Sequence, residues 1–513
     1  MGSRALAVIS LVTLAACGDA STPSNSRPEA AEKWFRRAQS SVAVADLDEA
    51  RDSVQKALSL VPEDVEVKTL AAQIALSSLN YAETLRLLKG VRTSEASGLR
   101  GRALWYKGDL DAAADELEAM LNDPDVKDSW AKATSKLARQ GAGRVPFGIA
   151  GGLLSAVEMV HINPAAPYFV VPLEIAGESA LAVVATGNAE VVLDSATHPE
   201  PSWVQLVFGQ AGGERLEVND VPALAQDLSG VSKEVGAPIK ALIGVNLLRH
   251  LNVTLDYTGH QFVARAYASP PPPNATRVPL HYVRGGGMVV QGTLGGENGP
   301  RAALLIDSSR AFPIALDQEG WKKAGLDVST LRPVPGDPEQ KLREGTVPLL
   351  RLGAFDVPRV EGVYGVPLTE LEKGLGVNLD GVLGSGLLYA YRCTFGDEGR
   401  LLWIEDDTAI RRMLESAAAG GEPDTSVSPS GAGALPPGAG VTPPGAGATP
   451  PGAGVRPAAP GAPGGGALPP PGASAPGLGA PPGLGAPPKT TPDAAPRPGA
   501  APKNVAPPAP KSP

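Results

Sequence analysis

Apolar residues recur at helical spacing through the first part of the chain, from Glu29 to about position 140. A short motif repeats inside this stretch: Asp-Leu-Asp-Glu-Ala begins at Asp46, Asn-Tyr-Ala-Glu-Thr at Asn80 and Asp-Leu-Asp-Ala-Ala at Asp109. The first two copies lie 34 residues apart and the last two lie 29 apart. Self-similarity at this period predicts stacked pairs of helices that bury a shared face over residues 29–140.

A different pattern, short apolar runs separated by turn residues, follows from about residue 160 to residue 406. Its elements occur twice in one order: an apolar run that ends in Asp-Ser, an Asp-Val-Pro segment, an apolar pair followed by Gly, and a Leu-Leu pair. The Asp-Ser pairs begin at Asp194 and Asp307, and the two glycines, Gly244 and Gly384, lie 140 positions apart. The order predicts two copies of one β-rich unit.

The helical stretch resembles about three tetratricopeptide repeats, because 34 residues is the period of that family. Trp34 in the first helix, Ala57 in the second, and Pro62 and Pro124 at repeat ends fit the resemblance. It implies a concave surface that accepts a peptide or protein, although such repeats can also act as spacers. A generic helical bundle is the alternative interpretation.

The repeated β unit resembles the retropepsin-like lobe, which viral aspartic proteases carry singly and pepsin-like proteases carry twice in one chain. In each lobe of that family an apolar strand ends in Asp-Thr/Ser-Gly, a glycine-rich flap follows, and an apolar-apolar-Gly strand passes behind the Asp loop. The resemblance implies an all-β, double-lobed fold, with residues 160–268 as the first lobe and residues 275–410 as the second.

The family mechanism, carried over to this chain, assigns the two catalytic carboxylates to Asp194 and Asp307. The hydroxyls of Ser195 and Ser308 would lock the two Asp loops together and preorganise them. Two carboxyl groups this close share one proton. The ionised one takes a proton from a water that attacks the amide, and the protonated one donates to the developing oxyanion. This would make the protein an aspartic endopeptidase.

The glycine-rich stretch after the first Asp loop resembles the flap of the family, with Gly209, Gly212 and Gly213 as its candidate residues. Only fourteen residues separate Asp194 from Gly209, and they include two prolines. The helix that the family has at this point is therefore predicted to be missing from the first copy. The second copy keeps a helix candidate at residues 316–325.

Both copies depart from the family at the third position of the motif, where Gly is replaced by Ala196 and Ser309. Gly suits tight loops because it has no Cβ. A Cβ in both loops is either absorbed by them or pushes the two carboxylates apart, which would lower the rate of hydrolysis. Two functions therefore stay open. One is an aspartic endopeptidase, and the other is a catalytically inactive, protease-like protein that binds peptides or holds an assembly, with protein interaction through the helical repeats.

The start of the chain has the features of a secretory signal: Arg4, an apolar run at residues 5–14 and small residues before Cys17. Leu-Ala-Ala-Cys resembles a bacterial lipobox, in which the Cys becomes the lipidated first residue; an ordinary signal is the alternative. The resemblance implies a signal peptide at residues 1–16, a tether at 17–28, and a membrane-anchored lipoprotein of the cell envelope. We expect the outer membrane, with the protein on the periplasmic or surface face.

Composition completes the picture. Residues 420–513 are mostly Pro, Gly and Ala and contain no aromatic residue, which predicts disorder. The net charge of −9 disfavours nucleic acid as a partner. The five histidines lack the spacing of metal ligands, so no metal and no other cofactor is expected. Cys393 is expected in the core of a strand. We expect a monomer whose partners are a peptide or protein and, through Cys17, the membrane.

Overall fold

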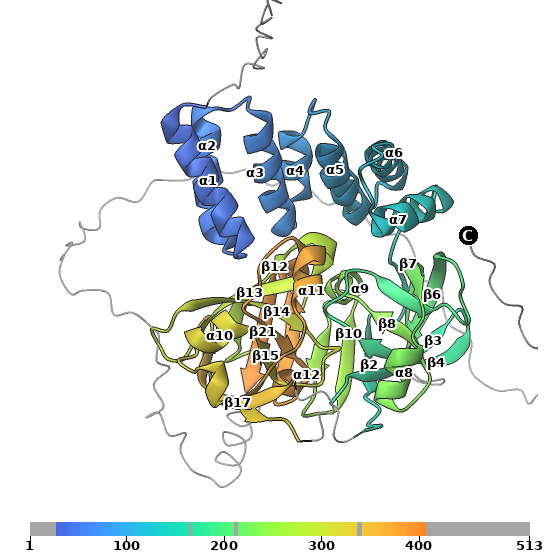
Figure 1. Ribbon diagram of the computed structural model, residues 1–513. Helices are drawn as coiled ribbons and strands as arrows, with labels where there is room; N and C mark the ends of the chain where they lie inside the picture. Colours follow the sequence, from blue (N-terminus) through green and yellow to red (C-terminus); the bar gives the residue numbers. More distant parts are fainter. Residues whose placement is uncertain (1–26, 164–166, 210–213, 336–340, 407–513) are drawn as a thin grey trace, which may run out of the picture. The chain divides into compact units, whose positions relative to one another are not determined.

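The computed structural model of this chain describes residues 27–163, 167–209, 214–335 and 341–406 (Figure 1). All of them belong to one compact unit, which ends at Gly433. Several predictions fall outside the described residues: the signal peptide at residues 1–16, the lipidation site Cys17, the flap residues Gly212 and Gly213, and the disorder expected of residues 420–513.

Paired helices form the first part of the described chain, as the sequence predicted. They are α1 (Glu29–Ala43), α2 (Leu47–Leu60), α3 (Val65–Ser77), α4 (Tyr81–Leu87), α5 (Ser94–Lys107), α6 (Leu110–Leu121) and α7 (Ser129–Gln140). The recurring motif marks the second helix of each pair. The side chains of Asp46 and Asn80 accept hydrogen bonds from first-turn N–H groups of α2 and α4, which is N-capping. Helix α4 has 7 residues against 14 in α2, which accounts for the shorter second spacing.

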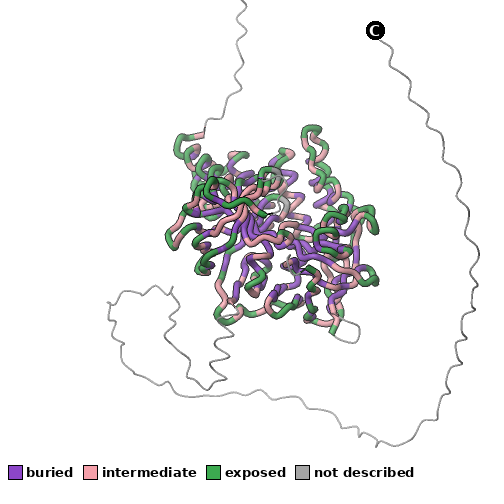
Figure 2. Tube along the Cα trace, turned by 60° about the horizontal axis from the view of Figure 1, so that its bottom comes forward, coloured by how far each residue is buried: buried purple, intermediate pink, exposed green. Residues whose placement is uncertain are grey.

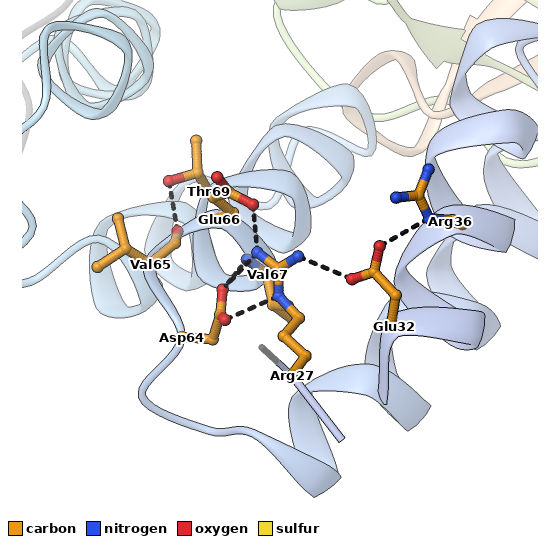
Figure 3. A network of polar contacts seen from close by, with 8 residues as sticks. All are labelled: Arg27, Glu32, Arg36, Asp64, Val65, Glu66, Val67 and Thr69. Carbon is orange, nitrogen blue, oxygen red and sulfur yellow. Dashed lines mark hydrogen bonds and ion pairs between the residues drawn. The ribbon is translucent and has the colours of Figure 1, made fainter. Parts of the chain in front are cut away.

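A charged network ties the start of this helical part to its second repeat (Figure 3). The Arg27 guanidinium donates from Nε to Oδ2 of Asp64 at 2.8 Å and from Nη1 to Glu32 at 3.0 Å, and it also pairs with Glu66. Asp64 caps α3, and its hydrogen bonds to the Arg27 guanidinium and to Val67 N–H hold the pKa of its carboxyl below the usual range, although burial opposes that shift. The network fixes the register between α1 and α3.

The first lobe is built on a seven-stranded sheet in the order β1-β7-β5-β8-β4-β3-β6. Its strands are β1 (Gly148–Gly151), β3 (Val170–Ile175), β4 (Glu178–Val184), β5 (Val191–Asp194), β6 (Ser202–Phe208), β7 (Leu216–Gln226) and β8 (Ile239–Ile243). Two short helices accompany the sheet, α8 (Ser229–Val235) before β8 and α9 (Val245–His250) after it.

The second lobe is built on an eight-stranded sheet in the order β12-β13-β14-β19-β15-β18-β17-β16. Its strands are β12 (His281–Tyr282), β13 (Met288–Leu294), β14 (Arg301–Asp307), β15 (Ile314–Leu316), β16 (Arg332–Pro333), β17 (Arg343–Leu352), β18 (Phe355–Tyr364) and β19 (Gly381–Gly384). Its α-helices are α10 (Gln318–Lys323), α11 (Thr369–Leu375) and α12 (Ser385–Leu388). Short 3₁₀ turns lie at Arg284–Gly286, Val328–Thr330 and Asp397–Gly399.

The two lobes repeat one topology. In the first, β4 runs parallel to β8 and β5 runs parallel to β7; in the second, β14 runs parallel to β19 and β15 runs parallel to β18. Helix α10 follows β15, whereas a short link without a helix follows β5. The predictions of a double-lobed β-rich part and of one missing helix are both confirmed.

A third sheet joins the lobes, in the order β11-β21-β20-β9-β10-β2. Its strands are β2 (Leu154–Glu158), β9 (Thr254–Asp256), β10 (Gln261–Arg265), β11 (Thr276–Pro279), β20 (Tyr391–Gly396) and β21 (Leu401–Asp406). At its centre Thr254 pairs with Thr394, and their Oγ1 atoms lie 2.9 Å apart. These threonines are related by the 140-residue offset of the repeat, so an approximate two-fold axis passes between them.

The β-rich part begins earlier than residue 160, the boundary that the sequence predicted. The glycine-rich strand β1 pairs with β7, and β2 pairs with β10. Burial alternates along β2, but only over five residues, which is too short a run to stand out in the sequence.

The helical part and the lobes share one apolar core. Val42 and Leu47 belong to the same buried cluster as Val289 and Leu305 of the second lobe, and buried positions, purple in Figure 2, concentrate in the interior. Polar contacts reinforce the packing: the Gln291 amide donates to the Ala45 carbonyl at 2.7 Å, Arg301 pairs with Asp46 at 2.7 Å, and Trp105 Nε1 donates to Glu190 at 3.2 Å. The lobes therefore cover part of the helical repeats.

Candidate functional site

The two lobes interlock through a pair of buried hydroxyl groups, those of Thr186 and Ser308. Thr186 N–H donates to Ser308 Oγ at 3.1 Å, and Ser308 N–H donates to Thr186 Oγ1 at 2.9 Å. Each hydroxyl then donates across the axis to a backbone carbonyl, Thr186 Oγ1 to Ile306 at 3.0 Å and Ser308 Oγ to Val184 at 2.6 Å. The four bonds are related by the two-fold axis and hold the loop after β4 against the loop after β14.

Strand register identifies which residues of the two loops correspond. In the first lobe Val184 pairs with the residue before the repeated glycine, and in the second lobe Ile306 pairs with the counterpart of that residue. The next residues, Ala185 and Asp307, are therefore equivalent. The motif of the first lobe is Ala-Thr-Gly at residues 185–187, and the motif of the second is Asp-Ser-Ser at residues 307–309. The first lobe carries a methyl group where the second carries a carboxylate.

The predicted equivalence of Asp194 with Asp307 is therefore wrong. Asp307 ends β14, whose counterpart in the first lobe is β4, whereas Asp194 ends the next strand, β5. Asp194 ends β5, and the pairing of β5 and β15 with their neighbours makes it the counterpart of Asp317. Ser195 is not part of the interlock; its N–H donates to the Gln226 carbonyl at 2.8 Å. Both predicted motifs follow an apolar run and begin with Asp-Ser, so the sequence pattern alone did not distinguish β5 from β4.

Asp194 has a lysine as its partner. Lys240 Nζ donates to Asp194 Oδ2 at 3.0 Å, and the Ala196 N–H donates to Oδ1 at 3.3 Å. Burial alone would raise the pKa of this carboxyl, but the Lys240 ammonium and the backbone N–H groups outweigh burial and lower the pKa. Asp194 is thus held ionised in a pair within its own lobe, rather than sharing a proton with another carboxyl group.

Asp307 is buried, and both of its carboxylate oxygens accept hydrogen bonds. Its Oδ1 accepts from Ser309 N–H at 3.0 Å and from Ser309 Oγ at 2.6 Å, and its Oδ2 accepts from Arg310 Nε at 3.2 Å. The two loops stay in hydrogen-bond contact through Thr186 and Ser308, so the Cβ at position 309 does not force them apart. Gly187 lies directly against the carboxyl group: a Cβ there would stand 2.6 Å from Asp307 Cγ. The glycine of the first motif is required by this contact.

Other groups near Asp307 carry charge or a hydroxyl. Tyr168 donates a hydrogen bond to Glu234. Burial first, and then the Glu234 and Asp307 carboxylates, raise the pKa of the Tyr168 hydroxyl, against an opposing effect of Arg310. Sequence reasoning missed Tyr168, Glu234 and Arg310. The one signal available was the Ala-Thr-Gly triplet, which keeps two of the three family residues.

The predicted flap lies away from this loop pair. Gly209 begins the turn between β6 and β7, and the atoms nearest to a Cβ at that position belong to Ser155, Glu214 and Arg215. None of these residues belongs to the loop of Asp307. The turn between β17 and β18, at Gly353, is its counterpart in the second lobe.

No group of three or more His, Cys, Asp or Glu side chains in the part of the chain that the structure describes could hold a metal ion. None of the described helices has both the length and the apolar character of a membrane span. Cys393 is buried in β20, as predicted, and burial raises the pKa of its thiol to about 12.

Comparisons with known proteins give partial structural matches to both parts. A retropepsin-like aspartic protease from Rickettsia conorii is 18% identical, with 26% of this chain and 94% of that chain covered and a TM-score of 0.20. The Arabidopsis OM64 TPR domain is 17% identical, with 22% of this chain and 96% of that chain covered and a TM-score of 0.20. No protein-family model and no curated protein matches the chain.

Proposed function

We propose that this protein is a protease-like binding protein that does not hydrolyse peptides. Ala185 carries the proposal, because it stands at the position equivalent to Asp307 across the interlock. Hydrolysis by an aspartic dyad needs two carboxyl groups that share one proton, one as base and the other as acid. A methyl group can do neither.

The surroundings of Asp307 support the same conclusion. Its two oxygens accept from Ser309 and Arg310. Both oxygens are thus occupied by donors of the second lobe, and position 185 of the first lobe supplies no second carboxyl group. Asp194 offers no substitute, because Lys240 occupies its Oδ2. Among the described residues, the Asp194 carboxylate accepts from Lys240 and from the Ala196 N–H rather than from Thr186 or Ser308. Its position therefore gives no support to the endopeptidase alternative.

The interlock itself supports retention of a two-lobed binding fold. Thr186 and Ser308 are buried and form four hydrogen bonds between the lobes. These bonds keep the two halves in fixed relation whether or not a carboxylate precedes the hydroxyl residue. The ligand class that fits such a fold is a peptide or an extended protein segment. Anchoring through a lipidated Cys17, with the protein on the envelope membrane, belongs to the same proposal.

Digestion of a peptide library with the full chain at pH 3 to 7 tests this function. We expect no cleavage by the wild-type protein or by Asp307→Asn. Ala185→Asp, combined with Ser309→Gly, introduces a second carboxyl group and removes the hydroxyl that donates to Asp307 Oδ1, while the backbone N–H of residue 309 still donates to that oxygen; we expect acid-favoured cleavage from this variant alone. Cleavage by the wild type that Asp307→Asn abolishes would refute the proposal.

Membrane anchoring has a separate test. Cys17→Ser should move the protein from the membrane fraction to the soluble fraction, since the acyl chains are its only proposed anchor. If the variant still sediments with membranes after a high-salt wash, the lipoprotein assignment is wrong.

A further inference from the structure

A cavity of about 690 Å³ lies between the helical part and the lobes. Its walls come from helices α3, α5 and α7 on one side and from α9, α11 and the segment around Tyr282 on the other. The volume falls in the range of small-ligand sites, roughly 300–1,000 Å³. Neither the interlock nor Asp307 contributes to the walls, so the cavity is distinct from the loop pair described above.

Basic side chains dominate the charge of the cavity wall. Five of the lining side chains are basic and two are acidic, namely Arg102, Lys127, Arg249, Arg284 and Lys373 against Glu95 and Asp128. The chain as a whole has a net charge of −9, so this local excess of positive charge runs against the overall balance. Such a wall attracts an anion.

Two hydrogen-bonding atoms of residues that line the cavity are themselves buried and have no partner among the described residues. They are Nη1 of Arg102 and the hydroxyl of Tyr106, one helical turn apart on α5. A buried donor without an acceptor is destabilising, and a guanidinium N–H can only donate. An acceptor-rich group, such as a carboxylate or a phosphate, would satisfy both.

Arg102 is held in place by its other contacts. Its Nη2 donates to Asp128 Oδ2 at 2.7 Å, and the guanidinium carbon lies 3.9 Å from the ring centroid of Trp130. These contacts fix the plane of the guanidinium, so that the free Nη1 is preorganised rather than mobile. Arg249, across the cavity, lies 5.5 Å from the Tyr106 ring centroid.

The rest of the wall is largely apolar, with Leu76, Leu79, Leu99, Met120 and Leu375 among its residues. These side chains suit a hydrocarbon body and offer it no hydrogen bonds. The helical part contacts the lobes at two further places, where Arg301 pairs with Asp46 and Trp105 donates to Glu190. A cavity of this volume suits an occupant of small-molecule size.

We infer that this cavity binds a small anionic ligand with an apolar body, a carboxylate or a phosphate monoester, whose oxygens accept from Arg102 and Tyr106. The ligand contacts the helical part and the lobes at once, so its binding links the two. The inference does not depend on the proposed loss of proteolysis.

Calorimetric titration of the full chain with octanoate and octyl phosphate tests the inference. Acetate and inorganic phosphate serve as head-group probes, and octanamide serves as the uncharged body. We expect saturable binding of at least one eight-carbon anion with a Kd below about 1 mM, and binding of octanamide at least about tenfold weaker. Tighter binding of octanoate assigns a carboxylate ligand, and tighter binding of octyl phosphate assigns a phosphate monoester.

Variants locate the site. Arg102→Met should weaken binding about tenfold or more, the cost of one charged hydrogen bond, and Tyr106→Phe by a few-fold. Arg102→Lys keeps the positive charge beside Asp128 and should recover part of the affinity, which checks that the methionine variant has not simply misfolded. Arg86→Met is the matched control, because Arg86 is exposed, pairs with Glu83 and does not line the cavity.

Three outcomes would overturn the inference. The first is no saturable binding of either eight-carbon anion up to about 10 mM, a limit far above the Kd of a real site. The second is equal affinity in the wild type and Arg102→Met while Arg86→Met is unchanged. The third is binding that depends on Arg102 but is seen only for a short acidic peptide, which would make the cavity a peptide site.

Discussion

The two lobes share a topology and an interlock but differ at the first residue of the motif. Both place a hydroxyl residue, Thr186 or Ser308, at the axis, and both hold a glycine, Gly244 or Gly384, against the backbone of the neighbouring loop. The first lobe then has Ala185 where the second has Asp307. The residues that fix the fold are thus separable from the carboxyl group that would perform chemistry.

A second difference concerns the residues after the next strand. Asp194 in the first lobe pairs with Lys240, whereas its counterpart Asp317 in the second lobe caps α10 by accepting from Gly320 N–H at 2.6 Å. Helix α10 brings in Trp321, which is fully buried. The two equivalent aspartates therefore have different roles, because only Asp317 is followed by a helix whose N-terminus needs a cap.

Breaking the interlock should have the largest effect. Thr186→Val removes Oγ1 and leaves the Ser308 N–H and the Ile306 carbonyl buried without partners, so the free energy of unfolding should fall by about 3 kcal/mol. Ser308→Ala should cost about the same, because the bonds are symmetric. Urea unfolding followed by circular dichroism measures both.

Ser195→Ala is the matched control for the interlock, and it should change the free energy of unfolding by less than about 0.5 kcal/mol. A loss from Ser195→Ala equal to that from Thr186→Val would mean that Ser195 belongs to the interlock after all. The comparison of lobes by register would then fail.

The glycines of the repeated block give the next effect. A Cβ at position 244 would stand 2.2 Å from the Glu190 carbonyl oxygen, and a Cβ at position 384 would stand 2.1 Å from the Phe312 carbonyl oxygen. Backbone must move in both cases, so Gly244→Ala and Gly384→Ala should each lower the free energy of unfolding by about 2 to 3 kcal/mol. Thermal unfolding of the two variants should therefore give similar losses.

Two helical glycines serve as controls, one in each lobe. Gly230 in α8 and Gly374 in α11 have no atom within 4 Å of a Cβ. Because alanine favours the helix, Gly230→Ala and Gly374→Ala should leave stability unchanged or raise it by up to about 1 kcal/mol. If only one of the 244 and 384 variants were damaging, the lobes would not share this contact.

The sequence predicted the large features of the fold because they repeat. Helix pairs at a 34-residue spacing and two β units with a common offset of 140 are visible without structure. The candidate site was only half predicted. Ser308 belongs to the interlock and Asp307 precedes it, but in the first copy the Asp-Ser pattern pointed to Asp194, which pairs with Lys240 instead. Position 185 carries no carboxylate that a sequence pattern could mark, so the pairing of β4 with β8 was needed to identify Ala185 as the counterpart of Asp307.

The contacts between the helical part and the lobes were also beyond the sequence. Glu190 follows the first motif by a few residues, yet its partners are Trp105 of α5 and Asn246 of α9. Long-range polar pairs of this kind have no periodic signature. The same holds for the basic cavity, whose residues come from separate segments of the chain.

The smallest effect compares the equivalent aspartates, whose pKa values shift in opposite directions. The Lys240 ammonium, against the effect of burial, lowers the pKa of Asp194 from 3.8, so this carboxylate contributes stability above about pH 4 that is lost as the pH falls further. Burial raises the pKa of Asp317, so its effect on stability becomes unfavourable as the pH rises above 3.8.

Replacing Asp194 or Asp317 by asparagine, one at a time, shows how each carboxylate affects stability. Asp194→Asn should lower the free energy of unfolding by about 1 kcal/mol at pH 7, since the ion pair is partly exposed, and the difference should vanish below about pH 3. Asp317→Asn should be neutral or slightly stabilising at pH 7, because asparagine also caps helices. Urea titrations at pH 3 and pH 7 measure both. If the two variants lost stability equally at pH 7, Asp194 and Asp317 would have the same role, and the contrast between lobes would be confined to position 185.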